Sequence, residues 1–198
     1  MTVLKPDLEL LLQRIAGSGI SPSAAQNQGP PLTMKSAHVF LFRPCLIQEF
    51  SQTNSPEAFR ELLDKQTEEL RLYLPPGTNK NGTPRGQHWG SARKFLNIFL
   101  FECTLNRYLC DHYENLHNLE PWLEVPLDSF VGNGLALDAE NKARLQWVSI
   151  VGLEKETSDQ FQAVAQLVAK RENIYRVHLD LYYLRYRDYP RYPDRVTQ

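Results

Sequence analysis

The sequence predicts an all-α protein. Apolar residues recur at intervals of three and four in several segments, which is the spacing of an amphipathic helix. Serine, aspartate and proline stand where such segments begin, as they do at helix N-termini. One short apolar run, residues 38–42, fits either a strand or the start of a helix. We expect seven or eight helices that form a single helical domain over residues 1–198.

The composition is that of a globular chain without a basic field. Of the 198 residues, 42% are apolar and 11% are aromatic, which is enough for a substantial core. A formal net charge of −1 counts against a nonspecific nucleic-acid coat protein. No apolar run approaches the roughly 18 residues of a membrane span, and no secretion-signal pattern is present. We expect a cytoplasmic protein with three reduced cysteines, no metal and no cofactor.

The first half of the chain predicts two helices separated by loops. Residues 4–15 carry leucine and isoleucine at helical spacing, and a polar stretch at residues 18–36 follows as a loop. Ser55 as a cap, with Pro56 at the first helical position, marks the start of the second helix. Proline and glycine end that helix before a polar loop at residues 77–88.

The second half predicts a long central helix at residues 91–113. Its apolar positions lie on most sides, so it should be buried among other helices. Asp128 directly precedes a short helical segment, residues 129–137, and would cap it. Further helices are expected at residues 145–153, 157–168 and 175–186.

Lys94 is the first candidate for chemistry. It would lie in the first turn of the central helix, where the positive end of the helix dipole and the neighbouring Arg93 both lower the pKa of its amine, as does any burial. A lysine that is neutral near pH 7 is a nucleophile that can form a Schiff base. The alternative is a solvated surface lysine without a catalytic role.

Asp128 is the second candidate. As a helix cap it would accept backbone N–H bonds, which hold a carboxylate ionised and fixed in direction. Such a carboxylate, placed in a cleft, can stabilise a developing cation or orient a water molecule. The alternative is a capping aspartate with no further function.

The segments around these two residues resemble those of a known enzyme family. GSARKFLN at residues 90–97 resembles the Gly-x-Gly-Arg-Lys-x-x-Asn stretch of helix-hairpin-helix DNA glycosylases of the endonuclease III type. VPLDSFV at residues 125–131 resembles the Val-Pro-Val-Asp-Thr-His-Val stretch of that family. The hairpin before the lysine departs from the family's Leu-Pro-Gly-Val-Gly, and the archaeal 8-oxoguanine DNA glycosylases, with an irregular hairpin, are the more similar members.

The resemblance implies a two-lobed helical fold whose catalytic segment covers about residues 86–137 and contains an irregular helix-hairpin-helix. It also implies excision of an altered base that has left the stack of duplex DNA. Lys94 would attack the sugar C1′, and Asp128 would stabilise the charge on the sugar and help to deprotonate the lysine. An additional lyase step could then cleave the DNA backbone. With Lys94 turned outward, Asp128 and a water molecule would give simple hydrolysis. The target would be an oxidised purine or a bulky modified base of phage DNA, and the latter would make the protein a defence factor.

Other residues near the two segments complete the predicted site of a monomeric, DNA-binding enzyme. Tryptophans can stack on a flipped base, whereas polar side chains can read its edge. The predicted base pocket consists of Trp89, Trp122, His88 and Gln87, with core packing as the alternative for the two tryptophans. The predicted contacts to the DNA backbone are Lys80, Arg85, Gly90 and Arg93. A competing hypothesis is a helical protein-interaction module without catalysis, in which Lys94 is exposed and Asp128 only caps a helix.

Overall fold

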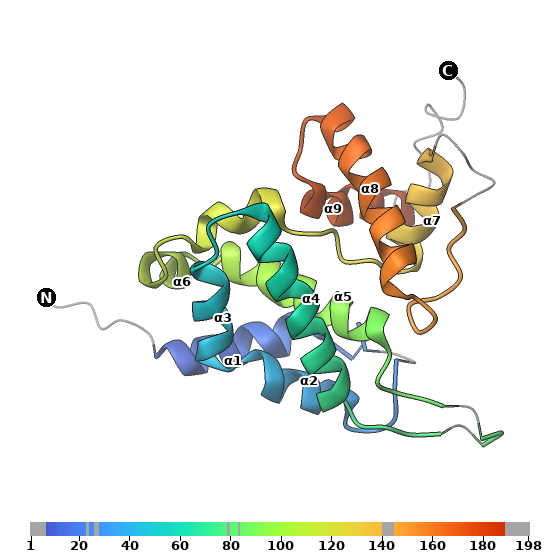
Figure 1. Cartoon of the computed structure of the whole chain (residues 1–198), viewed down its shortest axis with the longest axis horizontal. Helices are drawn as coiled ribbons and strands as arrows, with labels where there is room; N and C mark the ends of the chain where they lie inside the picture. The colour runs from blue at the N-terminus through green and yellow to red at the C-terminus, as the bar shows by residue number, and fades with distance from the viewer. Residues whose placement is uncertain are drawn as a thin grey trace, which may run out of the picture.

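The structure, a computed structural model, describes residues 7–22, 24–25, 28–78, 80–82, 84–139 and 145–188. Over these ranges the chain is all-helical, as predicted, with a single isolated β-bridge between Thr78 and Pro84. No described helix is both long and apolar enough to span a membrane. The elements, shown in Figure 1, are α1 (Leu8–Gly19), α2 (Thr33–Leu41), α3 (Pro44–Ser51), α4 (Pro56–Tyr73), α5 (Trp89–Thr104), α6 (Arg107–His112), the 3-10 helix η1 (Leu116–Trp122), α7 (Ser129–Asp138), α8 (Lys155–Glu172), the 3-10 helix η2 (Arg176–His178) and α9 (Leu179–Asp188).

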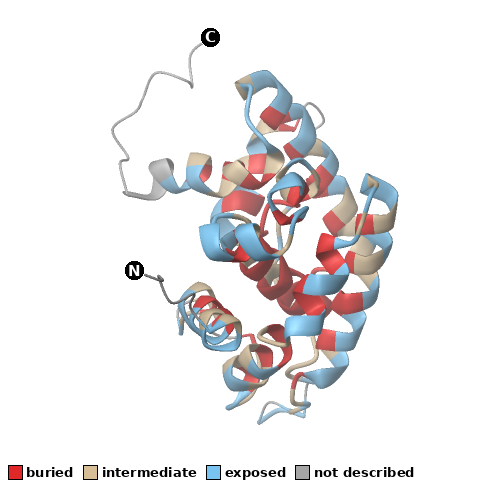
Figure 2. Ribbon diagram, turned by 90° about the vertical axis from the view of Figure 1, so that its left-hand side faces the viewer, coloured by how far each residue is buried: buried red, intermediate tan, exposed pale blue. Residues whose placement is uncertain are grey.

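Buried apolar side chains form two clusters. The first joins α1–α6, η1 and Val177 of η2, and the second joins α7, α8, α9 and the segment before α8. Figure 1 shows the elements of the first cluster at the lower left and those of the second at the upper right. In Figure 2 the buried positions lie where helices face one another. The chain passes from the first cluster at Leu123 to the second at Val125.

Helix α5 is the centre of the first cluster. Most of its residues are buried, in agreement with its apolar character on most sides. It packs against α1, α2, α4, α6 and η1. The following helix is separate because the Asn106 side chain accepts hydrogen bonds from the N–H groups of Tyr108 and Leu109, at 3.1 and 3.2 Å. The predicted continuous helix over residues 91–113 is therefore two helices, with Asn106 as the cap of α6.

Two predicted helix starts agree with the structure. The hydroxyl of Ser55 accepts a hydrogen bond from the N–H of Ala58 at 3.1 Å, and Pro56 is the first residue of α4. Asp128 caps α7 through its Oδ1 atom. Residues 38–42 prove helical, because α2 covers most of them, and a new helix begins at Pro44.

The predicted helix at residues 145–153 is wrong. The structure has no helix there, and most apolar side chains of the segment are at least partly buried in packing contacts instead. The ring of Trp147 lies against Gly132 and meets Phe161 edge to face, with 5.5 Å between ring centroids. The carbonyl of Ile150 lies so close to Gly90 that a Cβ there would overlap it. Tertiary packing outweighs helix periodicity in this segment.

The contact between Gly132 and Trp147 predicts an asymmetric response to glycine substitution. Gly132→Ala should destabilise the protein by about 1–3 kcal/mol, because the added Cβ would overlap the indole ring and the core must shift. Gly17→Ala is the matched control, because a Cβ there meets nothing within 4 Å and alanine favours the helix by roughly 0.5–1 kcal/mol. Urea unfolding of the two variants measures both effects. Equal stability of the two variants would contradict the packing described.

Candidate active site

Lys94 lies on the part of α5 that faces the second cluster, and its side chain is largely buried. Burial lowers the pKa of its amine, whereas the nearby Asp128 and Asp180 carboxylates raise it. No described residue forms a hydrogen bond or an ion pair with Nζ. Because α5 begins at Trp89, Lys94 belongs to the second turn, where the helix dipole acts weakly. Burial, one of the causes expected from the sequence, therefore lowers the pKa, and the dipole contributes little.

Asp128 is fixed at the start of α7. Its Oδ1 atom accepts hydrogen bonds from the N–H groups of Phe130 and Val131, at 2.9 and 3.0 Å. Pro126 and the buried Leu127 precede it and restrict the backbone on that side. The carboxylate thus has a defined direction while its residue remains partly accessible from the cavity that Lys94 also lines.

Asp180, in the first turn of α9, is the third ionisable group of this cavity. Burial, and next the negative charge of Asp128, raise the pKa of Asp180 to about 6, although Lys94 opposes the shift. This residue is not among those predicted from the sequence. Its one signal is an acidic side chain within an apolar stretch, and an acid at a helix start has an ordinary explanation in the helix dipole. Only the packing of α9 reveals its place beside Lys94.

The cavity that contains these groups has a volume of about 610 Å³. Its size lies within the roughly 300–1,000 Å³ of small-molecule sites. Apolar and aromatic side chains line it beside the three ionisable groups, and the indole of Trp147 is the largest of them. Val148, 86% exposed, stands at its edge. The remaining lining residues include Ala24, Gln28, Ile98, Phe130, Ser149, Ile150 and Leu184.

Gln28 supplies a polar group to the cavity wall. The residue is buried, and its Nε2 donates a hydrogen bond to the carbonyl of Ala24. Its Oε1 atom is buried and has no hydrogen-bond partner among the described residues. Buried polar atoms are nearly always paired, so this unpaired acceptor is an exception in the wall of the cavity. The sequence showed Gln28 only as part of a polar loop.

The four residues predicted for the base pocket do not line this cavity. Trp122 packs against Phe59, with 6.1 Å between ring centroids, and faces a different cavity. Trp89 is 8% exposed and lies beneath the guanidinium of Arg93, 5.3 Å from its ring centroid. Both tryptophans are packing residues, which was the alternative for them. Although both tryptophans are close in sequence to Lys94 or Asp128, neither lines the cavity that contains Lys94.

His88 and Gln87 bond the loop that precedes α5. The N–H of Gly86 donates to His88 Nε2 at 2.9 Å, and Gln87 Nε2 donates to the carbonyl of Leu72 at 3.1 Å. Gln87 adopts a φ of 53°, in the left-handed region. These bonds shape the turn into α5, and the prediction that the two side chains line the base pocket is not supported by their position.

Two of the four predicted backbone contacts are corrected by the structure. Arg93 is 2% exposed and bonded to carboxylates, so it cannot reach a phosphate. Gly90 is buried against Ile150 and is likewise closed to DNA. Lys80 is exposed and Arg85 is half-buried, both in the loop between α4 and α5. For these two, phosphate binding stays a prediction.

Comparisons of the chain with protein-family models, with curated proteins and with solved structures found no match. The chemistry available to the cavity is therefore inferred from its own residues.

Lys94 should react with an amine-modifying reagent at lower pH than an ordinary lysine. Its amine loses its proton below the usual pKa of about 10.4, because burial disfavours the charged form. Asp180→Asn should move the midpoint lower still, since that carboxylate raises the pKa of Lys94. Peptide mass spectrometry after brief labelling over about pH 6–11, a range that includes the reference pKa of lysine, measures the midpoint. The exposed Lys65 is the reference for reagent reactivity. A midpoint that rises in Asp180→Asn would contradict the placement of Asp180.

Asp180 should also make stability depend on pH. Because its folded-state pKa is raised to about 6, its stabilising effect is complete below the ordinary aspartate value and is lost as the pH rises through 6. Asp180→Asn should therefore be more stable than the wild type at pH 7.5 by roughly 1–3 kcal/mol, with the difference vanishing near pH 4. Urea unfolding at both pH values tests this. Asp111→Asn, at an exposed position of α6, should change stability little at either pH.

Proposed function

We propose that this protein is a DNA glycosylase that excises an altered base, with Lys94 as the nucleophile and Asp128 as its electrostatic partner. One observation carries the proposal: Lys94 and Asp128, 34 residues apart in sequence, line the same cavity. Lys94 is there largely desolvated and has no ion-pair partner among the described residues. A buried amine with a lowered pKa beside a fixed carboxylate is the arrangement that nucleophilic catalysis by lysine requires.

The reaction needs a neutral amine at the sugar. The lone pair of Lys94 Nζ forms a bond to C1′ while the N-glycosidic bond breaks, and its electron pair leaves with the base, which takes up a proton. Opening of the sugar ring and loss of a proton from nitrogen give a Schiff base. Water then hydrolyses the Schiff base, or elimination of the 3′-phosphate cleaves the strand first. Burial of Lys94 increases the neutral fraction that starts this sequence.

The two carboxyl groups have different parts in this scheme. Departure of the base builds positive charge on the sugar, and the fixed carboxylate of Asp128 stabilises that charge. Asp180, with a pKa of about 6, can take a proton from Lys94 and pass it toward the leaving base. The two aspartates of the cavity thus have different proposed roles: Asp128 is the fixed carboxylate, and Asp180 transfers a proton.

The lining of the cavity suits a flipped base. Trp147 offers an aromatic face on which a flipped base can stack. A volume of about 610 Å³ leaves room for a nucleotide with a substituent on its base. An oxidised purine and a bulky modified base of phage DNA are the two target classes that we propose. The first corresponds to DNA repair and the second to antiviral defence.

The arrangement of helices is compatible with a two-lobed glycosylase-like fold. The two buried clusters would form its lobes, with the cavity at their junction. Helices α4 and α5 and the loop between them would form the irregular helix-hairpin-helix. That loop carries Lys80 and Arg85, which we propose as contacts to the backbone of the DNA that a monomer binds.

The competing interaction module requires an exposed Lys94 and an Asp128 that only caps a helix. The shared cavity and the burial of Lys94 favour the enzyme. A variant of the enzyme hypothesis, hydrolysis by Asp128 and water alone, remains distinct because it forms no covalent intermediate.

Borohydride trapping tests the function directly. Duplexes that carry an oxidised purine, or a bulky modified pyrimidine, are incubated with wild type, Lys94→Ala and Asp128→Asn. The wild type should form a covalent protein–DNA adduct with its substrate, because borohydride reduces the Schiff base to a stable amine. Lys94→Ala should form none. Asp128→Asn should react roughly 100-fold or more slowly, through loss of charge stabilisation.

Lys65→Ala is the control, because it removes an exposed lysine of α4 outside the cavity and should leave the adduct unchanged. Base release without an adduct would indicate hydrolysis by Asp128 and a water molecule, with no role for Lys94 as nucleophile. Neither release nor adduct on either class of DNA would favour the interaction module and end the glycosylase proposal.

A further inference from the structure

Side chains from η2, α8 and α5 hold the segment that leads to Asp128. Arg176 of η2 donates from Nε and Nη2 to the carbonyls of Leu123 and Trp122, at 3.2 and 3.1 Å. Gln162 of α8 bonds both main-chain polar groups of Val125: its Oε1 accepts from the N–H at 3.2 Å and its Nε2 donates to the carbonyl at 2.8 Å. The segment has no regular secondary structure, so these bonds replace a helix or a sheet as its support.

Between these two attachments, the side chain of Glu124 meets Arg93 of α5. Nε of Arg93 lies 2.8 Å from Glu124 Oε2, and Nη2 lies 2.9 Å from Oε1. This is a two-point contact, which fixes orientation as well as distance. Asn97, one turn later on α5, donates to the same carboxylate at 3.3 Å. Both partners are buried, with side-chain exposures of 3% and 5%.

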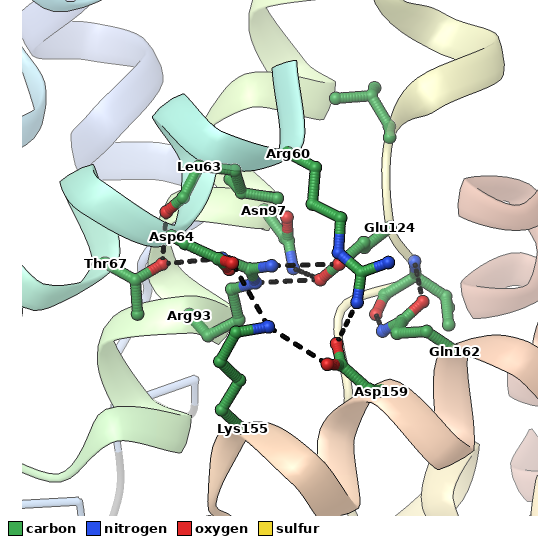
Figure 3. Close-up of polar contacts among 12 residues, drawn as sticks. Arg60, Leu63, Asp64, Thr67, Arg93, Asn97, Glu124, Lys155, Asp159 and Gln162 are labelled. Carbon is green, nitrogen blue, oxygen red and sulfur yellow. Dashed lines mark hydrogen bonds and ion pairs between the residues drawn. The ribbon is translucent and has the colours of Figure 1, made fainter. Parts of the chain in front are cut away.

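The pair belongs to a larger set of ion pairs, drawn in Figure 3. Arg93 also contacts Asp64 of α4 at 2.9 Å, and Asp64 contacts Lys155 of α8 at 3.1 Å. Lys155 contacts Asp159 at 2.9 Å, which in turn contacts Arg60 of α4 at 2.8 Å. Charges of alternating sign thus join α4, α5, α8 and the segment before α7. The set crosses from the first buried cluster to the second.

Arg93 and Glu124 each stand next to one side of the candidate site. Arg93 directly precedes Lys94, and successive side chains of a helix diverge by about 100°, since ~3.6 residues make one turn. Arg93 therefore points into the ion pairs while Lys94 points into the cavity. Glu124 lies four residues before Asp128, and Pro126 stiffens the connection. We propose that the Arg93–Glu124 pair sets the separation of Lys94 from Asp128 and that both are positioning residues of the reaction. The inference rests on the function proposed above.

The physical reason is the narrow tolerance of a nucleophilic attack. The amine must meet C1′ at the moment when the carboxylate stabilises the sugar, and a displacement of about 1 Å can lower a rate by about 100-fold. The helices α5 and α7, which hold the two groups, belong to different buried clusters, so neither cluster by itself fixes their separation. The Arg93–Glu124 contact joins α5 of the first cluster directly to the segment that leads into the second cluster, close to the candidate site.

The test compares variants of the pair with a control of similar stability. Glu124→Gln keeps the shape of the side chain and removes its charge, Arg93→Lys keeps the charge and removes the two-point contact, and Gln162→Met removes the bonds to Val125 without a change of charge. Leu109→Ala, in the buried part of α6, is the control that lowers the melting temperature outside the site. Single-turnover adduct formation and DNA affinity are measured well below every melting temperature.

We expect Glu124→Gln to slow adduct formation at least tenfold, and Arg93→Lys and Gln162→Met to slow it less. DNA affinity should stay within twofold, because none of the three residues is proposed to touch DNA. Leu109→Ala should stay within twofold of the wild-type rate. If Glu124→Gln does not fold, Arg93→Lys, the second variant of the pair, decides the question in its place. Rates for the pair variants that equal the Leu109→Ala rate would overturn the proposal.

A second readout does not depend on the glycosylase reaction. The carboxylates that raise the pKa of Lys94 are Asp128 and Asp180, and Glu124 is not among them. Arg93→Lys keeps every charge of the pair, so a shifted pH midpoint for labelling of Lys94 in that variant would report a changed distance to those carboxylates. If the wild type forms no DNA adduct, the proposed function fails, and this midpoint alone tests the positioning. An unshifted midpoint would then reject it.

Discussion

The buried ion pair between Arg93 and Glu124 is the interaction on which the candidate site depends. Removing two charges from water costs several kcal/mol for each ion, which only good geometry and further hydrogen bonds can offset. Here two hydrogen bonds join Arg93 to Glu124. Asn97 adds a hydrogen bond to Glu124, and Asp64 is a second ion-pair partner of Arg93. Although burial opposes both charges, the partners raise the pKa of Arg93 and lower the pKa of Glu124. The pair stays ionised and holds α5 against the segment that leads to α7.

Burial of ionisable groups is the origin of the reactivity proposed for the site, and the same burial lowers the stability of the folded protein. Lys94 and Asp180 are both held in surroundings that disfavour their charged forms, and so their pKa values move toward the neutral range from opposite directions. Neither shift arises from a strained backbone, since the charged groups lie on regular helices. The cavity exists because two buried clusters meet without filling the space between them.

Much of the fold could be predicted from local signals. Ser55 and Asp128 mark helix starts through bonds to backbone groups only two or three residues away, so the sequence contains both partners. The break at Asn106 has the same local cause but stands inside a long apolar stretch, whose periodicity hid it. The segment around Trp147 could not be predicted as irregular, because its conformation follows from contacts with Gly132 and Phe161.

Short stretches of neighbouring residues were sufficient to predict the helical class, the capped helix starts and the candidacy of Lys94 and Asp128. Tertiary structure decided which side chains surround these two residues. It brought in Asp180 from the last helix, and it assigned Trp89, Trp122 and Arg93 to packing. Burial, desolvation and ion pairing depend on residues distant in sequence, and adjacency in the chain does not specify them. A helix directs neighbouring side chains to different sides, so Arg93 and Lys94 have opposite surroundings.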